Sequence, residues 1–210
     1  MTDLSAITDA LISGDTQKVS SLVQEVIDQG TDPGEILNKG LIAGMDIVGE
    51  KMQEGEMFIP EVLMSASCMG DAVALLKPLL AEGDVQSAGH IVIGTVKGDL
   101  HDIGKNLVSM MVESSGFEVT DLGVDVSAED FVKAVQEKNP DVIALSALLT
   151  TTMPMMQQTV DALAKSGLRD KVKIIVGGAP VTQDFSDQIG ADGYAADAGS
   201  ASKLAKELCA

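Results

Sequence analysis

The sequence predicts an α/β protein in which an all-α domain precedes a doubly wound parallel sheet. Residues 1 to about 85 carry apolar side chains at helical spacing, without strand-like runs. From about residue 88 onward, short apolar runs of strand length alternate with helical stretches. Such alternation with short links indicates a parallel sheet covered by helices on both faces. We therefore predict a helical bundle at residues 1–87 and the sheet domain at residues 88–210.

About four helices are predicted in the first domain, enough for a small bundle. Asp15 is expected to cap a helix that stops at Gly30, and Asp32 to cap the next helix, which begins with a proline. A methionine-rich break at residues 49–60 separates that helix from a further one starting at Pro60. Helical spacing predicts the apolar stripes of the last two helices: Ile36, Leu37, Leu41, Met45 and Val48, then Val62, Leu63, Ala66, Met69, Val73 and Leu76.

The second domain is expected to contain five strands. They are predicted at residues 90–96, 118–122, 142–146, 173–176 and 193–196. About five parallel strands favour the flavodoxin-like strand order. Ser127 and Asp130 form a predicted capping box at a helix start, and the polar stretch at residues 81–89 is a predicted linker. Doubly wound sheets bind ligands outside the carboxyl ends of their strands, so the loops after the strands are the expected site.

The composition narrows the classes of partner. Acidic residues number 32 and basic residues 14, for a formal net charge of −18, which argues against nucleic acid and favours protein partners with basic docking faces. Cys68 and Cys209 form no recognisable disulfide framework, which is typical of a reducing compartment. The N-terminus lacks the features of a signal peptide, and no apolar run approaches the roughly 20 residues of a membrane span. We therefore expect a cytoplasmic protein with neither nucleic acid nor a membrane as partner.

One of the two histidines, His101, lies in the first predicted strand-to-helix loop of the second domain. Gly98 and Gly104 allow the backbone to turn and a large ligand to approach. Asp99 lies within hydrogen-bond reach of the imidazole, and a carboxylate on one ring nitrogen leaves the other for a metal. The alternative, of equal weight from the residues alone, is a solvated histidine with Asp99 or Asp102 as a helix N-cap. A metal held by one histidine has to arrive inside a cofactor that supplies its other ligands.

The other strand ends carry small and hydroxyl-bearing residues. Residues 146–152 after the third strand include serine, alanine and three threonines, two glycines follow the fourth strand, and Ala198 and Gly199 follow the fifth. Small residues at successive carboxyl ends leave room for a slot beside the sheet. A phosphate-binding loop is a poor alternative, because the sequence contains no glycine-rich phosphate motif.

Three motifs together resemble those of cobalamin-binding domains. Residues 99–104 match the Asp-x-His-x-x-Gly motif of that family, and residues 146–148 and 177–178 match its two further motifs, in the same order. Residues 1–85 resemble the helical cap of the cobalamin module of methionine synthase. The resemblance covers the whole chain, which is most similar to the free-standing corrinoid proteins of methyltransferase systems that act on methylamines, methanol or aryl methyl ethers.

The resemblance implies a cobalamin or related corrinoid cofactor, bound base-off and His-on, with His101 as the axial ligand to cobalt. Asp99 holds the imidazole, and Thr152 stands where methionine synthase has the serine that completes this relay. In the cap, Met52 and Ile59 lie over the methyl-bearing face and Asn38 near its edge. The remaining implied cofactor-binding residues are Gly98, Leu100, Asp102, Ile103 and Gly104 in the motif loop and, along the slot for the nucleotide tail, Ser146, Leu148, Thr150, Gly177, Gly178 and Ala198.

The function implied by the resemblance is that of a methyl carrier rather than a complete enzyme. The chain would accept a methyl group on cobalt(I) from a substrate-specific methyltransferase and pass it to a second methyltransferase that acts on a folate, pterin or thiol. A reductive activase is a further expected partner, and access for two partners implies domain motion over residues 81–89. Two alternatives are the cobalamin subunit of an adenosylcobalamin-dependent mutase, which needs no such cap, and a cobalamin sensor, which would carry an output domain.

Overall fold

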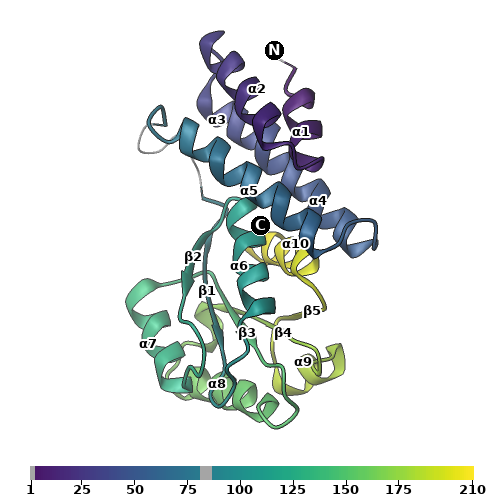
Figure 1. The fold of residues 1–210 in the computed structure, drawn as a ribbon. Helices are drawn as coiled ribbons and strands as arrows, with labels where there is room; N and C mark the ends of the chain where they lie inside the picture. Colours follow the sequence, from purple (N-terminus) through teal and green to yellow (C-terminus); the bar gives the residue numbers. More distant parts are fainter. Residues whose placement is uncertain (1–2, 81–86) are drawn as a thin grey trace. The chain divides into compact units, whose positions relative to one another are not determined.

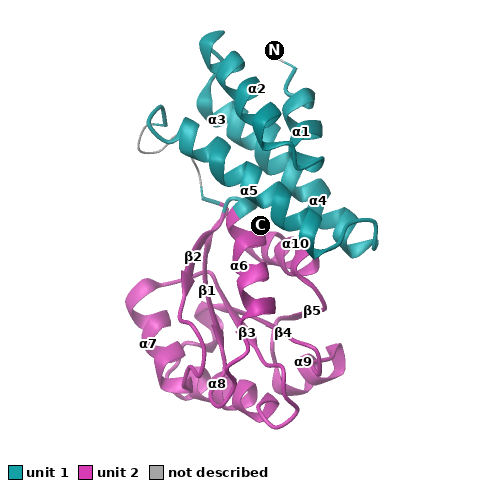
Figure 2. Cartoon of the chain, in the orientation of Figure 1, with its two compact units in different colours: residues 1–87, 114–116 teal, residues 88–113, 117–210 magenta. Residues whose placement is uncertain are grey.

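The computed structural model describes residues 3–80 and 87–210 and divides the chain into two compact units (Figure 1, Figure 2). Unit 1 comprises residues 1–87 and 114–116, and unit 2 comprises residues 88–113 and 117–210. Of the predicted linker at 81–89, residues 81–86 lie outside the described residues. The domain motion expected over this linker therefore stays a prediction.

Unit 1 is a bundle of four helical runs, as predicted. They are α1 (Ser5–Ile12), α2 (Thr16–Asp28), a continuous run of α3 (Pro33–Glu35), η1 (Ile36–Ile42) and α4 (Ala43–Gln53), and α5 (Ile59–Leu76). Both predicted N-caps are confirmed. Asp15 accepts a hydrogen bond from the Lys18 N–H, and Asp32 accepts one from the Glu35 N–H.

The segment η1 is a π-helix of seven residues inside the third run, which the helical spacing did not predict. A π-helix shifts the backbone hydrogen bonds by one residue and leaves carbonyl groups in need of other donors. Here the Thr8 hydroxyl of α1 donates to the Gly40 carbonyl at 2.9 Å, and the Asn38 amide donates to the Gly34 carbonyl at 2.8 Å. The sequence offers no pattern that distinguishes this segment from an α-helix, because its apolar residues still face the core.

Two details of the predicted fourth run are wrong. Leu63 is exposed, because it lies about 100° around the helix from Val62 and outside the buried face that Val62, Ala66 and Met69 define. The break between the runs is also shorter than residues 49–60, since α4 continues to Gln53. By length and composition alone α5 is long and apolar enough to cross a membrane, and it packs against α1, α2 and α4.

Unit 2 contains a parallel sheet with the order β2-β1-β3-β4-β5, which confirms the flavodoxin-like prediction. The strands are β1 (His90–Thr95), β2 (Glu118–Asp121), β3 (Val142–Ser146), β4 (Lys173–Gly177) and β5 (Gly193–Ala195), each within one residue of its predicted ends. The helices are α6 (Ile103–Ser114), α7 (Ala128–Lys138), α8 (Met153–Lys165), α9 (Gln183–Ile189) and α10 (Ala198–Cys209), with a short 3₁₀ turn η2 (Arg169–Lys171). The capping box of Ser127 and Asp130 is confirmed at the start of α7.

Helices cover both faces of the sheet. One apolar core joins strand residues such as Val92 and Ile143 to α7, α8 and α9, and the other joins Ile91 and Val142 to α6 and α10. The strand order reverses at β1, because the chain passes from β1 to β2 on one side and returns to β3 on the other. The β1–α6 and β3–α8 loops therefore leave neighbouring strands at the same edge, where Thr95 pairs with Ser146.

Candidate functional site

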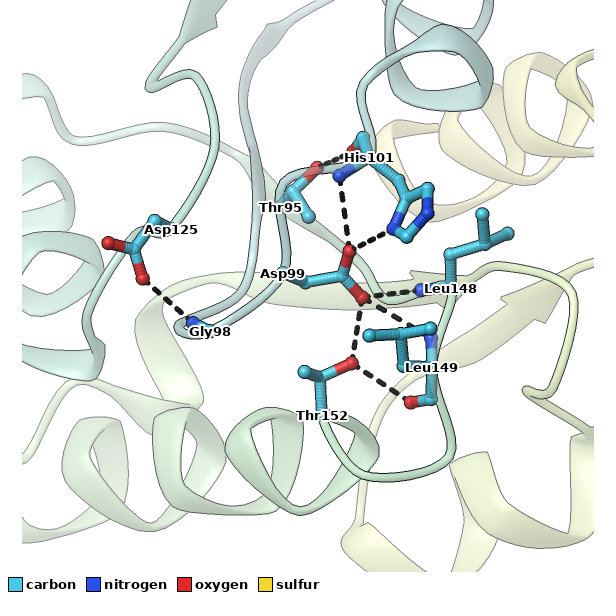
Figure 3. A network of polar contacts seen from close by, with 8 residues as sticks. All are labelled: Thr95, Gly98, Asp99, His101, Asp125, Leu148, Leu149 and Thr152. Atoms are coloured by element: carbon cyan, nitrogen blue, oxygen red, sulfur yellow. Dashed lines mark hydrogen bonds and ion pairs between the residues drawn. The ribbon is translucent and has the colours of Figure 1, made fainter.

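The site is built around a hydrogen-bonded pair in the β1–α6 loop (Figure 3). The buried carboxylate of Asp99 accepts hydrogen bonds on Oδ1 from the backbone N–H of His101 at 3.1 Å and from its ring Nδ1 at 2.6 Å. The Asp99 side chain is 0% exposed and the His101 side chain 50% exposed. Since Nδ1 faces an acceptor, this network assigns the ring proton to Nδ1 and leaves Nε2, which points away from Asp99, as the nitrogen with a free lone pair.

The second oxygen of Asp99 is held by the β3–α8 loop. Oδ2 accepts hydrogen bonds from the backbone N–H groups of Leu148 at 2.8 Å and Leu149 at 3.3 Å, and from the Thr152 hydroxyl at 2.7 Å. Asp99 is therefore not an N-cap of α6, and the alternative role considered for it is wrong. Burial alone would raise the pKa of Asp99, but the hydrogen bonds from His101, Thr152 and Leu148 outweigh it and hold the pKa well below its usual range.

Thr152 lies at the end of a continuous hydrogen-bonded chain that runs through Asp99 to His101 (Figure 3). Its hydroxyl lies 2.7 Å from Asp99 Oδ2 and 2.9 Å from the Leu149 carbonyl, so its single proton has two acceptors to choose from. The charged acceptor is the stronger one, which favours donation to Asp99. The sequence left open whether a threonine could take the place of the serine next to Asp99. The Thr152 hydroxyl does form this hydrogen bond, so the contacts from Thr152 through Asp99 to His101 are all present.

Replacing Thr152 by valine should destabilise unit 2 by about 1–2 kcal/mol, because the buried carboxylate loses one donor without gaining a water. Thr152→Ser should recover most of this loss. Tyr194 in β5 is the single tyrosine of a chain without tryptophan, so its fluorescence during denaturant unfolding reports on unit 2. Thr151→Val, at an exposed neighbour, is the matched control. Equal stability of the valine and serine variants would show that the hydroxyl contributes nothing.

Two further contacts shape the loop, and the sequence did not predict them. The Thr95 hydroxyl at the end of β1 donates to the His101 carbonyl at 2.8 Å. Asp125, in the β2–α7 loop, accepts a hydrogen bond on Oδ1 from the Gly98 N–H at 2.8 Å. Gly98 itself has φ +82°, a left-handed conformation for which glycine is suited. Leu149 was also missed, because a backbone donor carries no signal in its side chain.

Large apolar side chains next to His101 in the sequence, and in the loop that holds Asp99, are exposed. Leu100, Ile103, Leu148 and Leu149 are among the exposed large hydrophobic residues, with exposed fractions between 41% and 80%. Leu100 lies in the β1–α6 loop, Ile103 is the first residue of α6, and Leu148 and Leu149 lie in the β3–α8 loop. Exposed apolar clusters of this kind mark binding surfaces. A Cβ added at Gly104 would meet no atom within 4 Å, so space adjoins the loop there as well. An imidazole nitrogen within an apolar rim fits a metal carried in a large, mostly apolar macrocycle.

The remaining predicted residues divide between the two units. Ser146, Thr150, Gly177, Gly178 and Ala198 lie at or after the carboxyl ends of β3, β4 and β5, along the same edge of the sheet as His101. Ala198 is buried as the first residue of α10, whereas Thr150 is exposed. Asn38, Met52 and Ile59 belong to unit 1, where Asn38 and Ile59 are exposed and Met52 is half-buried. Their role in the site stays a prediction.

Comparison with known proteins gives consistent matches over both units. The B12 binding domain family matches residues 89–202, and a second B12 binding domain family matches residues 4–77. The chain is 47% identical to the dimethylamine corrinoid protein of Methanosarcina barkeri over 208 residues, covering 99% of this chain and 97% of that protein. It is 43% identical to a corrinoid protein of Desulfitobacterium hafniense, covering 99% and 98%.

Solved structures agree with these matches. A cobalamin-binding protein from Desulfitobacterium hafniense superposes with a TM-score of 0.85 at 38% identity, covering 98% of each chain. In the methanol:cobalamin methyltransferase complex of Methanosarcina barkeri, the matching chain gives a TM-score of 0.84 at 34% identity, covering 98% of this chain and 79% of that one. Family matches over both units, together with a relay that leaves one imidazole nitrogen for a metal, show that this chain belongs to the B12-binding corrinoid proteins.

Proposed function

We propose that this chain is a methyl carrier, which takes a methyl group from a substrate-specific methyltransferase and delivers it to a second methyltransferase on the cobalt of a bound corrinoid. The observation that carries the proposal is the hydrogen-bonded chain from His101 through Asp99 to Thr152, which fixes the ring proton on Nδ1. A neutral imidazole fixed in this tautomer presents Nε2 as a ligand. The corrinoid, when bound, supplies the cobalt that accepts and releases the methyl group.

The protein residues have three tasks in this function. His101 would hold the corrinoid through Nε2, and Asp99 would keep the imidazole oriented. Asp99 is buried and accepts five hydrogen bonds, which fix its carboxylate and with it the ring that it contacts. Leu100, Ile103 and Leu148 provide apolar contact for the macrocycle.

We propose for the slot that Ser146, Thr150, Gly177, Gly178 and Ala198 border the nucleotide tail beside the sheet. In unit 1, we propose that Met52 and Ile59 shield the methyl-bearing face and that Asn38 lies near its edge. Ile59 and Leu63 lie one helical turn apart on α5 and are both exposed, which gives the bundle an apolar stripe suited to this task.

The proposed partners follow from the names of the relatives and from the charge of the chain. The donor methyltransferase is supported by the relatives, which are named as corrinoid proteins of dimethylamine and trimethylamine systems. The second methyltransferase, acting on a folate, pterin or thiol, and the reductive activase are proposals. The formal charge of −18 suits basic docking faces on such partners. A cytoplasmic location is part of the same proposal.

A mutase subunit and a cobalamin sensor are less well supported. Three relatives named as corrinoid proteins match this chain over 98–99% of its length, including the helical unit that a mutase subunit does not need. The two B12 binding domain families account for residues 4–77 and 89–202, and the relatives that match both units are named corrinoid proteins rather than sensors. Methyl transfer between purified methyltransferases would distinguish a carrier from both alternatives.

The visible spectrum of the chain mixed with methylcobalamin tests the proposal. We expect a tight complex with the base-off, His-on band, and loss of that band in His101→Ala. His90→Ala is the matched control, since the other histidine bonds Thr120 with its Nε2 at 2.9 Å, at the opposite end of β1 from the loop. An unchanged spectrum in His101→Ala, or no complex at all, would contradict the proposal.

A further inference from the structure

Asp125 has an unusual backbone conformation for its residue type. Within residues 3–80 and 87–210, it is one of two non-glycine residues with positive φ, at +57°. The other, Asn139, is the C-cap of α7, where left-handed residues commonly end helices. Asp125 lies instead in the β2–α7 loop, beside Val126, whose backbone forms a bridge with Val96. Left-handed conformations of non-glycine residues cost free energy, and they concentrate at functional sites.

The contacts of Asp125 converge on the three residues that precede Leu100. Its Oδ1 accepts a hydrogen bond from the Gly98 N–H at 2.8 Å (Figure 3), and its own N–H donates to the Asp99 carbonyl at 3.0 Å. Its Oδ2 lies 3.1 Å from Lys97 Nζ. The first two contacts hold both ends of the Gly98–Asp99 segment. They therefore limit how far the Asp99 carboxylate can move.

The ion pair with Lys97 is the weakest of these contacts. The side chains of Lys97 and Asp125 are 56% and 43% exposed, and exposed pairs contribute little to stability. The hydrogen bonds to Gly98 and Asp99 depend on the left-handed backbone of Asp125, which turns its N–H and its carboxylate toward the same segment. Aspartate and asparagine tolerate this conformation best after glycine. Aspartate at this position is therefore suited to hold Gly98 and Asp99 in place through hydrogen bonds, and its ion pair with Lys97 matters less.

We propose that Asp125 is a positioning residue for the axial ligand: by clamping Gly98 and Asp99, it sets the orientation of the His101 imidazole. The inference rests on the proposed function, in which His101 binds cobalt. Asp125 acts on the imidazole through Asp99, from a loop that none of the three cobalamin motifs includes. Mutation of groups that orient a metal ligand typically lowers metal affinity about 10–100-fold. Asp125 contacts the imidazole only through Asp99, so we expect its substitution to lower metal affinity by about tenfold.

Nuclear magnetic resonance of the cobalamin-free chain tests the clamp directly. The His101 Nδ1–H, in a 2.6 Å hydrogen bond, should give a strongly downfield proton signal. Asp125→Gly keeps the backbone conformation and removes the carboxylate, so we expect that signal to shift upfield or disappear and the Nε2–H tautomer to increase. Asp125→Asn retains both the conformation and an acceptor oxygen and should restore the signal. Lys97→Ala, which removes the ion pair alone, is the control and should leave the signal unchanged.

Three results would overturn the inference. The first is a folded Asp125→Gly variant with the wild-type Nδ1–H signal and tautomer. The second is an Asp125→Asn variant that loses the signal, because charge rather than the clamp would then be responsible. The third needs no variant: fast hydrogen exchange of the Gly98 and Asp125 amides in the wild type would show that the clamp is not formed. Failure of the wild type to bind methylcobalamin would instead refute the proposed function, and it would leave these measurements unaffected.

Discussion

Gly178→Ala is expected to destabilise unit 2 by about 4 kcal/mol or more, the largest effect of any single methyl group added at the site. Gly178 has φ +129°, and a Cβ built there would lie 1.9 Å from the Ala147 carbonyl oxygen and 2.8 Å from its carbonyl carbon. These are backbone atoms of the neighbouring strand end, which cannot turn aside as a side chain can. Either the β4–α9 loop or the end of β3 has to move.

Such a movement should reach the Asp99 network. The Ala147 N–H donates to the Gly177 carbonyl at 3.2 Å, and the next two N–H groups along the chain are those that hold Asp99. The fraction of the Gly178→Ala variant that still folds should therefore also lose the His-on spectrum with methylcobalamin. Gly178, implied by resemblance as a residue beside the nucleotide tail, thus has a structural reason to be glycine that needs no ligand.

Gly104→Ala is the matched control, measured by denaturant unfolding with Tyr194 fluorescence. Gly104 has no positive φ, and its Cβ would meet no atom within 4 Å. In the first turn of α6, alanine should leave stability unchanged or raise it by up to about 1 kcal/mol. The two variants add the same methyl group, so similar stability losses would contradict the steric argument. A stable Gly104→Ala that binds methylcobalamin less well would indicate that the space at Gly104 is reserved for the cofactor.

Much of this fold follows from local patterns. The five strands and the caps at Asp15, Asp32 and Ser127 depend on the spacing of nearby residues, and the strand order was predicted from the number of parallel strands. Leu63 was assigned to the wrong face of α5, because an apolar residue next to a buried stripe looks like part of it. The π-helix at 36–42 was missed, because one shifted hydrogen bond leaves the apolar pattern nearly unchanged.

The candidate site was predictable only in part, for a related reason. His101 and Asp99 are two residues apart, so local reasoning could propose their contact, which lies at 2.6 Å. The contact between Asp99 and Thr152 spans 53 residues, and only the resemblance to a known family singled out that threonine. The roles of Leu149 and Asp125 depend on backbone groups and on a left-handed conformation. Neither leaves a mark in residue type or spacing, so three-dimensional structure was needed to find them.

Asp99→Asn should cost unit 2 about 3 kcal/mol at pH 7, as expected when one partner of a buried charged network is removed. Five donors converge on the two oxygens of Asp99, whereas asparagine offers one acceptor oxygen and an amide that is itself a donor. The amide meets the fewest donors when it faces His101, whose backbone N–H then loses its acceptor and whose Nδ1 would have to accept rather than donate. The ring proton would move to Nε2, and the His-on spectrum should be lost.

The cost of Asp99→Asn should depend on pH in a defined direction. The hydrogen bonds lower the pKa of Asp99 below its value of about 3.9 in the unfolded chain. The stability it contributes is therefore fully present above about pH 5 and is lost as the pH falls below about 4, toward the folded-state pKa. Unfolding followed by Tyr194 fluorescence at pH 7, 5 and 3.5 should show a constant difference between wild type and variant at the two higher values, and a smaller one at pH 3.5.

Asp102→Asn separates this effect from the loss of any carboxylate in the loop. Asp102 is exposed and accepts a hydrogen bond from the Asn106 amide at 3.3 Å, a contact that asparagine can still make. Its substitution should change stability by less than about 0.5 kcal/mol. If Asp99→Asn were no more costly than Asp102→Asn, or if its cost stayed constant down to pH 3.5, the buried carboxylate would not be the charged centre of the relay. His101 would then need another group to fix its tautomer.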